Sequence, residues 1–112
     1  MSAKPKVLFI DDDECVLKGI ELNLGRKYNL TVVSSGKDAL ELIATGEVFS
    51  VVVVDYVMPE MNGAEFLKEM RLYNQSAVTI LLTGATNFEY AAEFVAKVGG
   101  FVCLVNLALQ MS

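Results

Sequence analysis

Residues 51–63 read VVVVDYVMPEMNG and begin with the strongest strand signal in the chain. The four valines from Val51 to Val54 favour an extended strand, because β-branched side chains are stiff and pack well on a pleated surface. A strand that is apolar at every position needs cover on both faces, which is typical of a central strand in a parallel sheet. The run ends at Asp55, so a carboxylate directly follows the strand expected to be most buried.

Apolar runs and amphipathic stretches alternate on both sides of this segment. The apolar runs predict strands at residues 7–10, 30–33, 51–54, 78–82 and 101–105. Helices are expected to begin at four places: after Asp13, at Ser35, at Asn62 and at Thr86. Five strands separated by four helices predict an α/β domain of three layers, with a parallel sheet covered by helices on both faces.

The predicted helices carry end signals and inward-facing residues. Ser35–Asp38 and Thr86–Glu89 read as capping boxes, and Gly46 stands where the second helix should end. The residues expected to face the core recur at helical spacing: Val16, Leu17, Ile20 and Leu24, then Leu40, Leu42 and Ile43, then Phe66, Leu67 and Met70, and finally Tyr90, Ala91, Phe94, Val95 and Val98.

The amino-acid composition argues against several classes of function. A chain of 112 residues, 54% of them hydrophobic, has the size and make-up of one globular domain. Nine basic against fourteen acidic residues give a net charge of −5, and the basic residues are scattered, which argues against nucleic acid as a direct partner. The sequence holds no histidine, which excludes Ser-His-Asp hydrolases and His-ligated zinc. Cys15 and Cys103 read as free thiols in a reducing cytoplasm, and we expect neither a signal peptide nor a membrane span.

Four aspartates, Asp11, Asp12, Asp13 and Asp55, directly follow the first and third predicted strands. Ligands of open α/β sheets bind outside the carboxyl ends of the strands. If these two strands are neighbours, their ends lie about 4.8 Å apart and the carboxylates converge. Converging carboxylates repel one another unless a cation lies between them, and oxygen ligands alone favour Mg²⁺ or a similar ion such as Mn²⁺.

One carboxylate in such a site can attack a phosphoryl group while a hydroxyl donates to a phosphoryl oxygen, and Asp55 and Thr83 suit those roles. The alternative is that residues 11–14 only cap the first helix, since acids are favoured at helix N-termini. Capping by Asp12 or Asp13 is compatible with a site. Capping alone explains neither Asp55 nor the small Gly84 beside Thr83.

Three motifs in register resemble the receiver domain of response regulators, the phosphoacceptor half of two-component signalling. VLFIDDDECVL at 7–17 is similar to the family's acidic-pair motif, VVVVDYVMPEMNG at 51–63 to its phosphoacceptor segment, and ILLTGAT at 80–86 to its hydroxyl segment. The resemblance covers about residues 5–106. It implies a flavodoxin-like sheet of strand order 2-1-3-4-5.

The resemblance also implies a role for each matching residue. Asp55 would accept the phosphoryl group, and Asp12 would bind Mg²⁺ directly. Asp11 would help to hold the ion through water, and the backbone carbonyl of Val57 would supply a further ligand. Thr83 would donate a hydrogen bond to the phosphoryl group.

The C-terminal end departs from the family. Asn106 and Leu107 stand where the family has Lys-Pro, so the lysine that pairs the phosphoryl group is replaced by an uncharged donor. Cys103 stands where a switch aromatic is usual. Residues 98–112 carry no charge, and we expect the family's last helix to be truncated or missing here. We therefore expect residues 1–112 to be a single receiver domain, either the N-terminal fragment of a longer protein or closed by a partner such as a second copy.

The resemblance implies a cytoplasmic phosphoacceptor that is phosphorylated on Asp55 by a sensor histidine kinase or a histidine phosphotransfer protein. The donor acts in trans because the sequence has no histidine. The target is an output domain or effector protein, and no enzymatic activity is expected beyond phosphorylation and dephosphorylation of the domain itself. The alternative is a pseudo-receiver that acts as an interaction module without phosphorylation. An aspartate-nucleophile phosphatase is disfavoured, since Val57 stands where such enzymes carry a second acid.

Overall fold

The computed structural model describes residues 4–73, 76–84, 88–98 and 102–106. Five strands alternate with four helices in these residues: β1 (Lys6–Ile10), α1 (Glu14–Leu24), β2 (Asn29–Val33), α2 (Gly36–Ala44), β3 (Val51–Asp55), α3 (Gly63–Met70), β4 (Val78–Thr83), α4 (Phe88–Val98) and β5 (Val102–Asn106). All strands pair in parallel, in the order β2-β1-β3-β4-β5. The α/β fold and the strand order are therefore confirmed.

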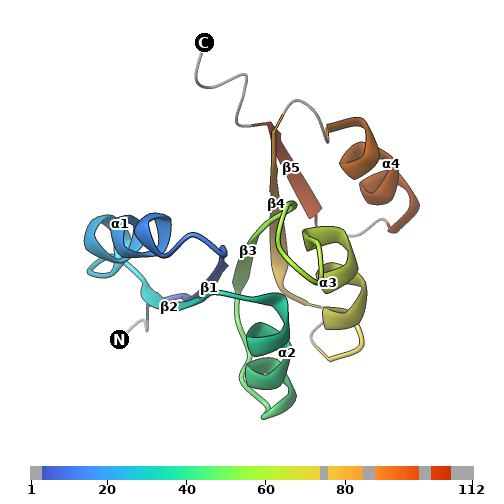
Figure 1. The fold of residues 1–112 in the computed structure, drawn as a ribbon. Helices are drawn as coiled ribbons and strands as arrows, with labels where there is room; N and C mark the ends of the chain where they lie inside the picture. The colour runs from blue at the N-terminus through green and yellow to red at the C-terminus, as the bar shows by residue number, and fades with distance from the viewer. Residues whose placement is uncertain (1–3, 74–75, 85–87, 99–101, 107–112) are drawn as a thin grey trace.

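The helices cover the two faces of the sheet unequally. Figure 1 shows α2, α3 and α4 on one side of the sheet and α1 on the other. The side with three helices holds the core, in which the strand residues Leu8, Ile10, Val52, Val54 and Leu81 are fully buried. The helices contribute Ala39, Ile43, Phe66, Leu67, Met70 and Ala91. These helix residues were expected to face inward, except Ala39, which the sequence analysis did not single out.

The face of the sheet that packs against α1 becomes more exposed to solvent from β1 toward β5. Phe9, Val53, Ile80 and Cys103 lie side by side in register across β1, β3, β4 and β5. Phe9 is buried, Val53 and Ile80 are half-buried, and Cys103 is exposed. The expectation that β3 is buried on both faces is therefore wrong for one face. The physical reason is that α1 lies beside β1 and β2 (Figure 1), and no other helix among the described residues covers this side.

Local side-chain chemistry sets the ends of the helices. Asn62 and Glu65 form a reciprocal capping box at the start of α3. At α2, the Ser35 hydroxyl accepts from the Asp38 N–H, and the described contacts do not include the return bond. The aspartate side chain is one carbon shorter than the glutamate of a capping box. Gly46 has a φ of 101° just after α2, as expected for a glycine that ends a helix.

Val16 and Tyr90 are wrong among the predicted core residues. Val16, in the first turn of α1, is 39% exposed, and the buried residue of that helix is its neighbour Leu17. Tyr90 is 67% exposed, whereas Ala91, the next residue in α4, is fully buried. Successive helical residues are rotated by about 100°, so a helix that points Ala91 at the core turns Tyr90 away from it. The Phe94 and Val98 side chains and most of the expected Thr86–Glu89 capping box lie outside the described residues. Cys15 and Cys103 are both free and exposed, in agreement with two free thiols.

No helix in the described ranges combines the length and the apolar character needed to cross a membrane.

Candidate functional site

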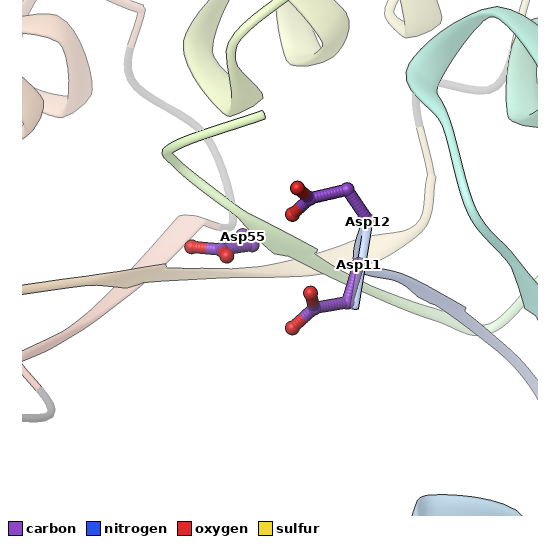
Figure 2. A group of neighbouring side chains, drawn as sticks. All are labelled: Asp11, Asp12 and Asp55. Carbon is purple, nitrogen blue, oxygen red and sulfur yellow. The ribbon is translucent and has the colours of Figure 1, made fainter. Parts of the chain in front are cut away.

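The parallel register brings three aspartates together at the carboxyl edge of the sheet. Asp11 and Asp12 follow β1, and Asp55 ends β3, the neighbouring strand. One carboxylate oxygen from each lies within 4.8 Å of those of the other two. Figure 2 shows the Asp11 and Asp12 side chains leaving the end of β1 beside that of Asp55. The convergence expected from the sequence is therefore present.

Asp11 is held by the turn that leads into α1. Its side chain is buried, and its Oδ1 accepts a hydrogen bond from the backbone N–H of Asp13 at 2.9 Å. Its own N–H donates to the carbonyl oxygen of Val33 in β2 at 3.2 Å. Asp12 is exposed at the mouth of the site. Two carboxylates from adjacent residues thus differ in burial.

Asp55 is held by the loop that follows it. The Val57 N–H donates to Asp55 Oδ1 at 3.4 Å. The Tyr56 N–H donates to the carbonyl of Leu82 in β4 at 2.7 Å, and the Tyr56 carbonyl accepts from the Gly63 N–H at 2.8 Å. These bonds tie the start of α3 and the end of β4 to the residue next to Asp55.

Burial and neighbouring negative charge raise the pKa of Asp55 and Asp11. Burial, followed by the negative charge of Asp11, raises the pKa of Asp55 from 3.8 to about 6, although the N–H groups of Val57 and Tyr56 oppose this shift. Burial also raises the pKa of Asp11, against the lowering effect of the hydrogen bond from Asp13. Charge is therefore costly at this site in the absence of a cation, and bound positive charge would relieve that cost.

The donor set fits a hard divalent cation. All three side chains offer oxygen, which Mg²⁺ prefers, and their separation allows one ion to contact more than one of them. In the ranges that the structure describes, no lysine or arginine forms an ion pair with these carboxylates. The ion pair found there joins Lys6 and Glu47, and Lys6 lies at the opposite end of β1 from Asp11.

The other predicted site residues lie at the same edge. Thr83 ends β4 and is almost fully buried, and its hydroxyl donates to the carbonyl of Gly84 at 3.1 Å. Asn106 ends β5 in register with Thr83, and its side chain lies outside the described part of the structure. Val57 contacts Asp55 by the hydrogen bond from its N–H, and its side chain is 56% exposed.

Two structural supports of the site were missed in the sequence. One is Gly63, whose N–H donates to the carbonyl of Tyr56, the residue next to Asp55. The other is the Asp13 N–H, which holds Asp11. Asp13 was considered as a helix cap, and it does cap α1: its Oδ1 accepts from the N–H of Cys15 at 2.9 Å. Capping and a cluster of site carboxylates therefore coexist in residues 11–13.

Comparison with known proteins identifies the family. The family model for the response regulator receiver domain matches residues 7–105. The chain belongs to this family, and it is a receiver domain of the two-component type. The resemblance inferred from the three motifs is confirmed.

Individual relatives agree with the family match. The two-component response regulator ORR11 of Oryza sativa subsp. indica is 42% identical over 72 residues, which cover 62% of this chain and 48% of that protein. This chain thus matches about half of that relative's length. Among solved structures, one described as the adenylate cyclase from Rhodopirellula baltica has a TM-score of 0.85 at 33% identity, covering 92% of this chain and 76% of that chain. The chemotaxis protein CheY4 of Vibrio cholerae has a TM-score of 0.77 at 27% identity, covering 92% and 87%.

Proposed function

We propose that Asp55 accepts a phosphoryl group from the phosphohistidine of a sensor histidine kinase or a histidine phosphotransfer protein. A carboxylate oxygen of Asp55 attacks phosphorus, and the P–N bond of the phosphohistidine breaks. The electron pair of that bond stays on the imidazole nitrogen, which then takes up a proton. The product is an acyl phosphate on Asp55. The observation that carries the proposal is the convergence of three carboxylates at the carboxyl edge of the sheet.

Mg²⁺ is the proposed cofactor, with Mn²⁺ as a substitute. The carboxylates of Asp11, Asp12 and Asp55 would hold the ion together with the carbonyl of Val57, Asp11 acting through water. When bound, the ion would neutralise charge on the phosphoryl oxygens. The choice of ion is supported by the all-oxygen donor set and by the raised pKa of Asp55, which burial and the nearby charge of Asp11 cause.

The surroundings favour Asp55 over its neighbours as the phosphoacceptor. Asp11 is buried, with one oxygen committed to the Asp13 N–H. Asp55 ends the middle strand, beside the strand that carries Thr83. Rotation of the Thr83 side chain would exchange its bond to the Gly84 carbonyl for one to a phosphoryl oxygen. Thr83 would then act as a hydrogen-bond donor to the phosphorylated state.

Asn106 takes the place of the family lysine in the proposed site. It can donate a hydrogen bond but adds no positive charge to a cluster of three carboxylates. We expect phosphorylation to depend more strongly on the divalent cation than it would with lysine at this position. The pseudo-receiver alternative rested on this substitution and on Cys103, and no observation from the fold or the comparisons favours it.

Phosphorylation would act on a partner through α4. A phosphoryl group adds nearly two negative charges, and Thr83, which would bond it, precedes the segment that leads to α4. Tyr90 is exposed on α4 and would change its position with that helix. The proposed target is an output domain or a separate effector protein in the cytoplasm.

The test is incubation with a small phosphodonor such as acetyl phosphate, followed by intact-mass measurement. We expect the wild type to gain the mass of one phosphoryl group with Mg²⁺ and not with a chelator. Asp55→Asn should gain nothing. Asp38→Asn, which changes an exposed aspartate of α2, should behave as wild type. A wild type that gains no mass, or an equal gain on Asp55→Asn, would overturn the proposal.

A further inference from the structure

Asp13 connects the carboxylate site to α1 through its backbone and its side chain. Its N–H donates to Oδ1 of Asp11 at 2.9 Å. Its own Oδ1 accepts from the N–H of Cys15 at 2.9 Å and of Val16 at 3.4 Å. Its carbonyl accepts from the Leu17 N–H at 3.1 Å, the first bond of the helix. One residue therefore caps α1 and supports a residue of the site.

The two sets of bonds depend on the same backbone conformation. Asp13 has φ −89° and ψ 107°, the extended conformation of an N-cap residue. That conformation lets the Asp13 side chain reach the first turn of α1. In the same conformation the backbone N–H of Asp13 points toward the Asp11 carboxylate. If the capping bonds are lost, the Leu17 N–H still bonds the Asp13 carbonyl, but no other described contact fixes the Asp13 side chain. The backbone N–H of Asp13 is then held less firmly toward Asp11.

The Asp13 carboxylate is not placed as a member of the cation site. The three carboxylates that lie within 4.8 Å of one another are those of Asp11, Asp12 and Asp55. The Oδ1 of Asp13 is directed at the backbone of α1. Its contribution to the site therefore passes through Asp11.

We propose that Asp13 is a positioning residue for the divalent-cation site, because its cap on α1 fixes the N–H that orients the Asp11 carboxylate. The inference rests on the proposed function, in which Asp11 helps to hold Mg²⁺. Loss of an outer hydrogen-bond partner of a metal ligand typically weakens metal binding by 10- to 100-fold. We expect Asp13→Ala to weaken Mg²⁺ binding by about tenfold, since Asp11 is one of several residues at the site.

The test is calorimetric titration of the whole chain with Mg²⁺ alone, at a temperature where circular dichroism shows each variant to be folded. Asp13→Asn keeps the cap and removes the charge, so its affinity should stay within about threefold of wild type. Glu14→Gln removes the same charge from the next residue, which is exposed, and should bind as wild type. Equal weakening in Asp13→Asn and Asp13→Ala would show that charge matters and not capping, and would overturn the inference.

A double-mutant cycle with Asp11→Ala, which removes the acceptor of the Asp13 N–H, separates positioning from a general structural effect. If Asp13 acts through Asp11, Asp13→Ala should have little further effect on Mg²⁺ affinity in the Asp11→Ala background. Additive losses would contradict the inference. If Asp13→Ala does not fold, Asp13→Gly takes its place in the cycle, since glycine is tolerated at N-cap positions and lacks the capping oxygen. A wild type that binds no Mg²⁺ contradicts the proposed function, whereas a binding wild type matched by Asp13→Ala contradicts only this inference.

Discussion

A Cβ atom at Gly63 would lie 2.6 Å from the backbone carbonyl oxygen of Asp55. It would also lie 2.7 Å from Cδ1 of Leu81 and 2.9 Å from Cα of Tyr56. Real Cβ atoms essentially never approach backbone atoms so closely. Glycine therefore allows the start of α3 to pack directly against the end of β3, which fixes the loop between them and the residue proposed as phosphoacceptor.

Gly63→Ala should destabilise the fold, because a methyl group at this position forces α3 away from β3. We expect a loss of about 1–3 kcal/mol in the free energy of unfolding, measured by urea denaturation. Gly84→Ala is the matched control at the same edge of the sheet, since a Cβ there would meet nothing within 4 Å. Equal stabilities of the two variants would show that the close approach does not exist in solution.

The turn at Glu60 is strained. Glu60 has a φ of 68°, the one positive φ among the described residues other than glycine, and the Met61 N–H donates across it to the Pro59 carbonyl at 2.7 Å. Glu60→Gly should therefore raise the free energy of unfolding by about 1 kcal/mol. Glu41→Gly, at an exposed position in α2, should lower it by about 1 kcal/mol. A loss in both variants would contradict the left-handed conformation at Glu60.

Stability should fall as pH rises through the range in which Asp55 titrates. In metal-free buffer, the native state keeps a proton on Asp55 up to its pKa of about 6, whereas an unfolded aspartate releases it near 3.8. The native state therefore binds more protons between these values, and the free energy of unfolding falls with rising pH. Asp55→Asn should gain stability relative to wild type from pH 4 to pH 7. The free energies of unfolding of the two proteins are measured by urea denaturation at each pH. A difference between them that stays constant over this range would contradict the raised pKa.

Two neighbouring residues of β4 test the unequal cover of the sheet. Leu81 is fully buried on the side of α2, α3 and α4, and Ile80 is half-buried on the side of α1. Leu81→Ala should cost about 2–5 kcal/mol in the free energy of unfolding, and Ile80→Ala should cost clearly less. Similar costs would mean that the second face is covered in solution, for instance by association of two copies. The mass of the wild type in analytical ultracentrifugation then shows whether two copies associate.

The strands could be predicted from local pattern, since the apolar runs match the observed strand ends to within one residue. The carboxylate cluster needed one further condition, that β1 and β3 are neighbours, which the family resemblance implied and the strand pairing confirms. The partial exposure of Val53 could not be predicted, because it depends on which helices pack against β3, β4 and β5. The outward orientation of Tyr90 agrees with the polar residues Glu89, Glu93 and Lys97, whose spacing of four marks the solvent side of α4, whereas the aromatic ring of Tyr90 had suggested a core position. The bond from the Asp13 N–H to Asp11 joins residues two apart, a turn that aspartate favours but that also depends on the local backbone geometry.

Chemical localisation of the phosphoryl group identifies the residue that accepts it. The chain is incubated with acetyl phosphate and Mg²⁺ and then treated with borohydride, which reduces an acyl phosphate to the alcohol and so converts an aspartyl phosphate to homoserine. Peptide mapping by mass spectrometry then locates the converted residue. We predict homoserine at position 55 in the Mg²⁺ sample and none in a sample treated with a chelator. Homoserine at position 11 or 12 in place of 55, or unmodified peptides throughout, would contradict the assignment of Asp55 as the phosphoacceptor.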